Sequence, residues 1–187
     1  MRRRRISGGK TIPARGTLRQ IRVRPRAGRA SEGWLQAGHL RLPVALGSSG
    51  IRANKREGDG ATPRGSFRLV RLWWRRDRAG RPRTLLPVRR IAQSDAWCEN
   101  PGDRRYNRPI QLAEAAGDRL WRNDHLYDLL IELDHNACPR IAGRGSAVFL
   151  HLARPGFRPT AGCVALAPES FRRLLVRLGP RTRIVIG

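Results

Sequence analysis

The stretch GSAVFLHLARPGFRPTAGCVAL, residues 145–166, sets the architecture of this chain. Its first half alternates: apolar Val148, Leu150 and Leu152 are interleaved with Phe149 and His151. Because successive side chains of a strand point to opposite faces, a strand here separates these two sets. Its second half ends in another short apolar piece, reached through a connection rich in Pro and Gly. We therefore predict two strands joined by a loop.

The same alternation recurs on both sides of this stretch. Residues 17–26 give an imperfect strand pattern, and residues 34–46 predict two strands joined at Ala37-Gly38. Pro43 inside the second of these indicates an edge strand or a bulge. Further strands are expected within residues 66–74, 126–136 and 182–187.

One segment has the pattern of a good helix. In PESFRRLLVRLG, residues 168–179, the apolar residues repeat at helical spacing and the arginines lie largely opposite. Pro168 suits the first helical position and Gly179 suits the C-terminal cap. A shorter helix is expected within residues 111–121. Strands otherwise dominate, so the predicted class is a β-rich α+β domain with one main helix near the C-terminus.

The length of 187 residues suits one domain, and a hydrophobic fraction of 40% is enough for a sizeable core. We predict a basic, disordered arm over residues 1–15 and a single domain over residues 16–187. The start of the chain is basic but has no apolar segment, so no secretory signal is recognised. No run of 18 apolar residues predicts a membrane span.

Charge is the most unusual feature of the composition. Lys and Arg number 39 against 14 Asp and Glu, which gives a formal net charge of +25. Such a surface attracts polyanions, so a polyanion-binding module is one interpretation of the chain. Against it, the arginines are dispersed and no nucleic-acid-binding motif is present. A compositional bias without a partner accounts for the charge equally well.

The three cysteines are Cys98, Cys138 and Cys163. Their number is odd, so at least one is unpaired within the chain. A disulfide between Cys98 and Cys138 is an open alternative. His135 and Cys138 have the spacing of a metal-ligand pair, but His151 and Cys163 are too far apart for a standard finger. We expect no metal and no cofactor.

Of the three cysteines, Cys163 has a sequence environment suited to a reactive thiol. It follows Gly162 in a turn, where the N–H groups of Ala161, Gly162 and Cys163 can converge as an oxyanion hole. A free thiol is mostly protonated at neutral pH and needs a base, and His151 is the best candidate. The pattern alone is also compatible with Cys163 as a small buried apolar residue and His151 as a satisfied core residue.

Two segments together resemble the L,D-transpeptidase (YkuD-type) catalytic domain. The first matches the family's upstream His followed by a Ser/Thr-x-Gly-Cys turn, through His151, Thr160, Gly162 and Cys163. The second is KREGDGATPRG, residues 55–65, which resembles the family's Lys-x-Glu-Gly-Asp-Gly-x-Thr-Pro-x-Gly segment. The resemblance extends over roughly residues 17–187 and implies a β-sandwich or barrel.

This resemblance implies an acyltransferase that acts on peptidoglycan stem peptides in the periplasm or cell wall, as a monomer and without a cofactor. Cys163 would be the nucleophile and His151 the proton acceptor and donor, with the Leu152 carbonyl or a nearby group orienting the imidazole. Tyr106, Asn107, Arg154, Arg158 and Thr160 are the candidate substrate contacts. Plain surface charge is the alternative for the arginines.

The chain departs from the family pattern at two positions near the cysteine. Many members have His where Ala161 stands, and Arg or Asn where Ala165 stands, and the gap between His and Cys is also shorter here. Both proposed catalytic residues are retained. The acyl acceptor therefore stays open: an amine would make the protein a transpeptidase and water an L,D-carboxypeptidase.

Overall fold

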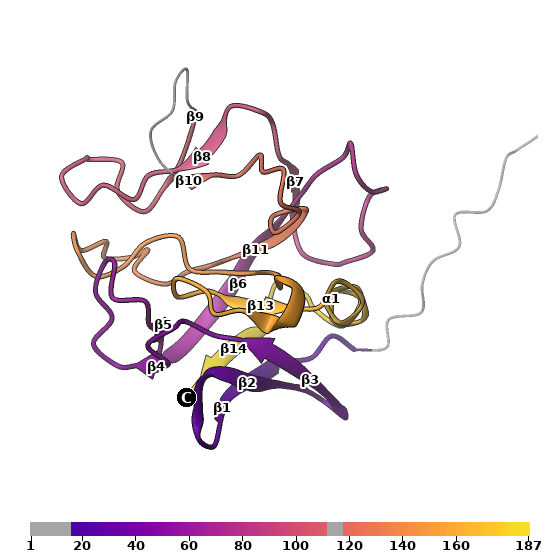
Figure 1. Ribbon diagram of the computed structural model, residues 1–187. Coiled ribbons are helices and arrows are strands. Elements are labelled where there is room, and N and C mark those ends of the chain that lie inside the picture. Colours follow the sequence, from indigo (N-terminus) through magenta and orange to yellow (C-terminus); the bar gives the residue numbers. More distant parts are fainter. Residues whose placement is uncertain (1–15, 112–117) are drawn as a thin grey trace, which may run out of the picture.

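A computed structural model describes residues 16–111 and 118–187 (Figure 1). The predicted arm, residues 1–15, lies outside this range, as does the centre of the helix expected within residues 111–121. The strands are β1 (Gln20–Arg26), β2 (Arg29–Ala37), β3 (Leu40–Ala45), β4 (Ile51–Arg52), β5 (Thr62–Pro63), β6 (Gly65–Trp74), β7 (Val88–Arg90), β8 (Asp95–Trp97), β9 (Pro109–Gln111), β10 (Asp118–Arg119), β11 (Leu129–Leu133), β12 (Phe149–Leu152), β13 (Val164–Leu166) and β14 (Arg183–Ile186). The helices are a short 3-10 turn, η1 (Pro155–Phe157), and α1 (Pro168–Leu175).

The main sheet closes into a barrel. Its strand order is β11-β12-β13-β3-β2-β1-β14-β6-β7, and β6 also pairs with β11, which joins the two sides of the sheet. One edge of the long strand β6 carries first β14 and then β7, and the other edge carries β11. The predicted β-rich fold with one main helix near the C-terminus is confirmed.

Two smaller sheets accompany the barrel. One is the pair β4–β5, and the other has the order β10-β8-β9 and lies at one end of the molecule (Figure 1). The described ends of the helix expected within residues 111–121 belong to this second sheet, because Gln111 pairs with Asp95 and Asp118 with Trp97. The prediction of a helix was therefore wrong at both ends. Cross-strand pairing outweighs local helix propensity there.

The interior of the barrel is filled by the apolar side of the alternating strands. Val148, Leu150 and Leu152 belong to this core, as predicted, together with residues of every strand of the ring and of α1. Phe149 lies on the other face of β12, in a second cluster that also contains Trp73, Trp97 and Tyr127. The second cluster lies outside the barrel. It separates the barrel from the β10-β8-β9 sheet and is the part of the core next to the candidate site.

Two local predictions have different outcomes. The ladder between β3 and β13 covers Val44 and Ala45 and stops short of Pro43, which is thus tolerated at an edge. The helix α1 begins at Pro168 as predicted, but it ends at Leu175 rather than near Gly179. Gly179 instead begins the turn to β14, where its N–H donates to the hydroxyl of Thr182 at 3.0 Å.

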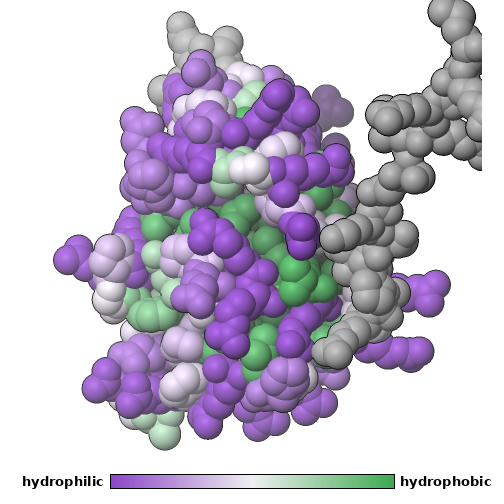
Figure 2. Space-filling model, turned by 90° about the vertical axis from the view of Figure 1, so that its right-hand side faces the viewer, coloured by the Kyte–Doolittle hydropathy of each residue, from purple (hydrophilic) through white to green (hydrophobic). Residues whose placement is uncertain are grey.

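The surface is strongly hydrophilic on the face shown in Figure 2, with smaller apolar areas between the polar side chains. This agrees with the excess of Lys and Arg in the sequence. Within the described residues, no helix has both the length and the apolar character needed to cross a bilayer.

Candidate active site

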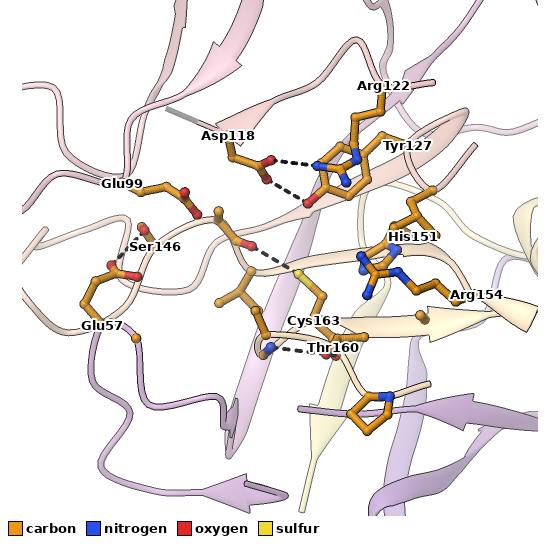
Figure 3. A pocket seen from close by; sticks show the side chains of 18 of the residues that line it. Glu57, Glu99, Asp118, Arg122, Tyr127, Ser146, His151, Arg154, Thr160 and Cys163 are labelled. Atoms are coloured by element: carbon orange, nitrogen blue, oxygen red, sulfur yellow. Dashed lines mark hydrogen bonds and ion pairs between the residues drawn. The ribbon is translucent and has the colours of Figure 1, made fainter. Parts of the chain in front are cut away.

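The candidate site lies where β12 and β13 run side by side. These strands are parallel, with Leu150 opposite Val164 and His151 opposite Ala165. Cys163 immediately precedes β13, so the loop carrying η1 brings it back beside the strand that holds His151. Both residues line one pocket of about 500 Å³, and Figure 3 shows their side chains facing it. The pairing that sequence spacing suggested is thus present in space.

The imidazole of His151 is held in one tautomer. Its Nδ1 lies 2.8 Å from the carbonyl oxygen of Leu152, and a carbonyl only accepts, so Nδ1 carries the proton and Nε2 has a free lone pair. The edge-to-face ring of Tyr127, 5.3 Å away, supports the imidazole from the side. The expected orienting role of the Leu152 carbonyl fits this geometry.

Burial keeps His151 neutral. Only 6% of the residue is exposed, and desolvation lowers its pKa to about 4. The Leu152 carbonyl opposes this shift, whereas the positive charges of Arg122 and Arg154 add to it. At neutral pH the ring is therefore an unprotonated base.

Cys163 is also buried and neutral. Desolvation raises the pKa of its thiol to about 12, and the backbone of Phe149 opposes the shift. The negative charges of Asp118 and Glu99 raise it further. The thiol lies 3.2 Å from the carbonyl oxygen of Ala147, to which it donates. Among the described residues, the hydrogen bonds of Cys163 do not include one to His151.

The turn before Cys163 is built by a threonine and a glycine. The hydroxyl of Thr160 accepts from the N–H of Gly162 at 3.1 Å and donates to the carbonyl of Cys163 at 2.7 Å. Gly162 has φ +148°, and a Cβ there would lie 2.8 Å from the carbonyl oxygen of Ala61. A side chain is therefore excluded on both counts. Within the described part of the chain, the N–H groups of Ala161 and Cys163 have no such partner.

The second motif, residues 55–65, forms the wall behind this turn. The carboxylate of Asp59 accepts from Lys55 Nζ and from the N–H groups of Arg56 and Ala61, which folds the segment back on itself. The Lys55 stem then lies 3.5 Å from where a Cβ of Gly162 would stand. The hydroxyl of Thr62 is 3.4 Å from the Cys163 carbonyl. The two motifs are distant in sequence and adjacent in space.

The pocket carries charges of both signs. Glu57, Glu99 and Asp118 lie on one side of Cys163, and Arg122 and Arg154 lie near His151 (Figure 3). Desolvation raises the pKa of Asp118, although the hydroxyl of Tyr127 donates to it at 2.7 Å. The pKa of Glu99 rises to about 7 through lost solvation and then the charges of Asp118 and Glu57. A ligand with both an ammonium and a carboxylate matches this arrangement.

Three of the predicted substrate contacts line the pocket: Thr160, Arg154 and Arg158. The structure places Tyr106 and Asn107 elsewhere. The hydroxyl of Tyr106 donates to Glu57, a residue of the pocket wall. Asn107 is buried and fully hydrogen-bonded to protein groups, so it has no atom to offer a ligand.

Sequence reasoning overlooked several pocket residues. Tyr127, Asp118 and Arg122 lie in or next to short strands, and nothing in their local pattern indicates a shared site. Lys55 and Glu57 were found only as part of a family-like motif. The one signal for Tyr127 is its place at the start of a strand pattern, which many core aromatics share.

The other cysteines and the histidines form no second centre in the described residues. All three thiols are free, with Cys98 buried and Cys138 exposed, so the open alternative of a Cys98–Cys138 disulfide is not realised. No group of three or more His, Cys, Asp or Glu side chains within residues 16–111 and 118–187 is arranged to hold a metal ion.

A closed barrel with a buried thiol and imidazole in one external pocket is the arrangement of a candidate thiol-dependent enzyme. The sequence matches the L,D-transpeptidase catalytic domain family (YkuD) over residues 25–186, which is nearly the whole chain, and the protein belongs to this family. Members act on peptidoglycan and their domains are typically associated with the cell wall. Searches of curated proteins and of solved structures gave no match.

Proposed function

We propose that this protein is a cysteine-dependent L,D-transpeptidase that acts on peptidoglycan stem peptides through a thioester. The observation that carries the proposal is the placement of Cys163 and His151 in one pocket, with the Nε2 lone pair of His151 left free by the Leu152 carbonyl. Thiol, base and orienting group are the three parts that acyl transfer by a cysteine requires.

In the proposed first step, Nε2 of His151 removes the thiol proton while Sγ of Cys163 attacks the carbonyl between the diamino acid and the terminal D-Ala. The C–N bond then breaks, and His151 returns the proton to the departing amine. The diamino acid stays on Cys163 as a thioester. An amine of a second stem attacks this thioester, His151 removes its proton, and the thiol is regenerated.

The resting protonation states fit this sequence. Because burial disfavours both a thiolate and an imidazolium, the pair starts neutral and charge develops only during attack. The proposed oxyanion hole of Ala161, Gly162 and Cys163 begins with two available donors. The Gly162 N–H is already used by Thr160, so Ala161 and Cys163 supply the direct contacts.

Charge in the pocket supports a stem peptide as substrate. Arg154 and Arg158 are exposed on the loop between β12 and β13 and suit the carboxylate of the terminal D-Ala. Glu99 and Asp118, on the other side of Cys163, suit the free ammonium of a diamino acid. We also propose that the protein acts as a monomer, and that it acts in the periplasm or cell wall, where peptidoglycan lies.

The test uses a carbapenem, a class of ligand that acylates enzymes of this family, and intact-protein mass spectrometry. The wild type should gain one adduct, Cys163→Ala should gain none, and His151→Ala should react at least tenfold more slowly. Cys138→Ala is the matched control, because its thiol is exposed and outside the pocket. Equal behaviour of all four proteins would refute the proposal and favour polyanion binding.

A tetrapeptide stem then identifies the acceptor. Release of D-Ala together with a cross-linked dimer supports transpeptidation. Tripeptide without dimer would replace the proposal by an L,D-carboxypeptidase that uses the same thioester and water.

A further inference from the structure

Two residues outside the described catalytic pair adopt an unusual backbone conformation and are bonded to each other. Asn107 has φ 54° and Ala147 has φ 51°, in the left-handed region that Asn adopts more readily than other residues with a Cβ, so the backbone strain lies mainly at Ala147. The side-chain oxygen of Asn107 accepts from the N–H of Ala147 at 3.2 Å. Strain of this kind persists only where surrounding contacts hold it, and it often marks a functional position.

Asn107 has the contacts needed to hold that strain. It is 7% exposed, and its side-chain oxygen also accepts from Trp97 Nε1 at 3.0 Å. Its Nδ2 donates to the carbonyls of His135 and Asn136 at 3.0 and 2.9 Å. Both donors and the acceptor are therefore used, which fixes the orientation of the amide. A substrate contact would require breaking one of these buried bonds.

Ala147, whose N–H is bonded to the Asn107 side chain, also contacts the proposed nucleophile. The carbonyl of Ala147 accepts from the Cys163 thiol at 3.2 Å, and Ala147 itself lines the pocket. Ala147 lies two residues before β12, the strand that carries His151. One short chain of bonds thus runs from the Asn107 amide through Ala147 to Sγ of Cys163.

We propose that Asn107 is a positioning residue, which clamps Ala147 in its left-handed conformation so that the Ala147 carbonyl fixes the resting direction of the Cys163 thiol. The inference rests on the proposed function for the role of Cys163 as nucleophile. The carbonyl confines Sγ to one rotamer inside the pocket. During attack the proton passes from Sγ to Nε2 of His151, while the Ala147 carbonyl loses its donor.

Loss of the clamp should slow acylation of Cys163 and leave ligand binding nearly unchanged. A thiol that samples several rotamers is less often aligned with His151 and a bound carbonyl, and misplacement by about 1 Å can cost about a hundredfold in rate. The residues suited to ligand charge, Arg154 and Arg158, belong to a different loop. The rate at saturating ligand should therefore fall, while the half-saturating concentration changes little.

The experiment compares the wild type with Asn107→Ala, Ala147→Gly and the double variant. With a carbapenem, Asn107→Ala should lower the saturating acylation rate 10- to 100-fold and shift the half-saturating concentration less than threefold. Glycine adopts a positive φ without strain, so Ala147→Gly should restore part of the rate when added to Asn107→Ala. A saturating rate within twofold of wild type in folded Asn107→Ala would overturn the proposal, as would the absence of any rescue.

Alkylation by iodoacetamide separates positioning from general loosening. A thiol released from the Ala147 carbonyl is better solvated and ionises more readily, so Asn107→Ala should be alkylated faster at Cys163 while it is acylated more slowly. The buried Cys98 is the internal control and should stay unmodified. If Cys98 and Cys163 become reactive together, the substitution has only unfolded the region and the proposal fails.

A gentler variant covers the case in which Asn107→Ala does not fold. Trp97→Phe retains an aromatic ring against Phe149 and removes the indole donor to Asn107, together with part of the ring volume. Like Asn107→Ala, it should lower the saturating acylation rate, here by about threefold. An unchanged rate would contradict the clamp.

Turnover of a tetrapeptide stem keeps the two proposals apart. If the wild type does not turn over the stem but alkylation of Cys163 still depends on Asn107, the transpeptidase function fails and the clamp stands. If the stem is turned over and Asn107→Ala has no effect, the clamp fails and the function stands.

Discussion

The buried imidazole makes a sharp prediction about pH. General-base attack requires neutral His151, whose pKa of about 4 lies well below the ordinary value of 6.5 because the ring is desolvated. At pH 5 a base with a pKa of about 4 is about nine-tenths neutral, whereas one with an ordinary pKa is only about 3% neutral. The two cases therefore differ by about 30-fold in acylation rate at pH 5.

The assay is the initial rate of carbapenem acylation between pH 3 and 8, measured by mass spectrometry and corrected for hydrolysis of the ligand. We expect a flat rate from pH 8 to about 5.5 and a fall with an inflection near pH 4. Both partners start neutral, so the ultraviolet absorbance of a thiolate should be absent at pH 7. An inflection near pH 6.5, or thiolate absorbance at neutral pH, would contradict a pair that is neutral at rest.

The same shift has a consequence for stability. The folded-state pKa of His151 is depressed, so the unfolded chain binds the proton first as pH falls. The stability that neutral His151 permits is therefore present above pH 6.5 and is lost between pH 6.5 and 4. A shift of this size corresponds to roughly 3 kcal/mol. His151→Gln should lack this loss. The free energies of unfolding of the wild type and of this variant, measured by denaturant titration at several pH values between 6.5 and 4, test the expectation.

Three further substitutions test the surroundings of the site. Phe149→Ala removes a fully buried ring and should lower the free energy of unfolding by about 3–5 kcal/mol in denaturant titration, whereas exposed Arg172→Ala should leave it nearly unchanged. Thr160→Val removes the acceptor of the Gly162 N–H and leaves the Cys163 carbonyl only the longer bond from Thr62, so it should cost about 1–3 kcal/mol and slow acylation; a normal rate would show that the turn does not depend on the hydroxyl. Arg154→Ala should raise KM for a tetrapeptide about five- to tenfold with little change in kcat, and a loss confined to kcat would contradict its proposed role in binding carboxylate.

Much of the barrel could be predicted because several of its strands alternate between apolar and polar residues. In β12 and the residue before it, Val148, Leu150 and Leu152 belong to the barrel core, whereas Phe149 and His151 lie on the other face, as predicted. Periodicity does not report which strands are neighbours. The pairing of β6 with both β14 and β11, which closes the barrel, is set by contacts between residues more than a hundred positions apart and residues about sixty apart.

The candidate site was also predictable from sequence only in part. Cys163, His151, Thr160 and Gly162 are close in sequence, and a loop between two predicted strands allows them to meet. Only the structure shows that these strands are parallel neighbours. Asn107 was predicted from sequence as a substrate contact, and the structure instead shows its amide consumed by buried hydrogen bonds to Trp97, His135, Asn136 and Ala147.

Residue order alone was enough to predict the class of the fold, to nominate the thiol and imidazole of the candidate site, and to reveal the two motifs that relate the chain to its family. Those features depend on residue type and short spacing, which a linear pattern records. The neutral state of His151 and Cys163, the tautomer of the imidazole and the direction of the thiol are visible only in the folded chain. Solvent exclusion and hydrogen-bond geometry set these properties, and both arise only when distant segments pack around the same atoms.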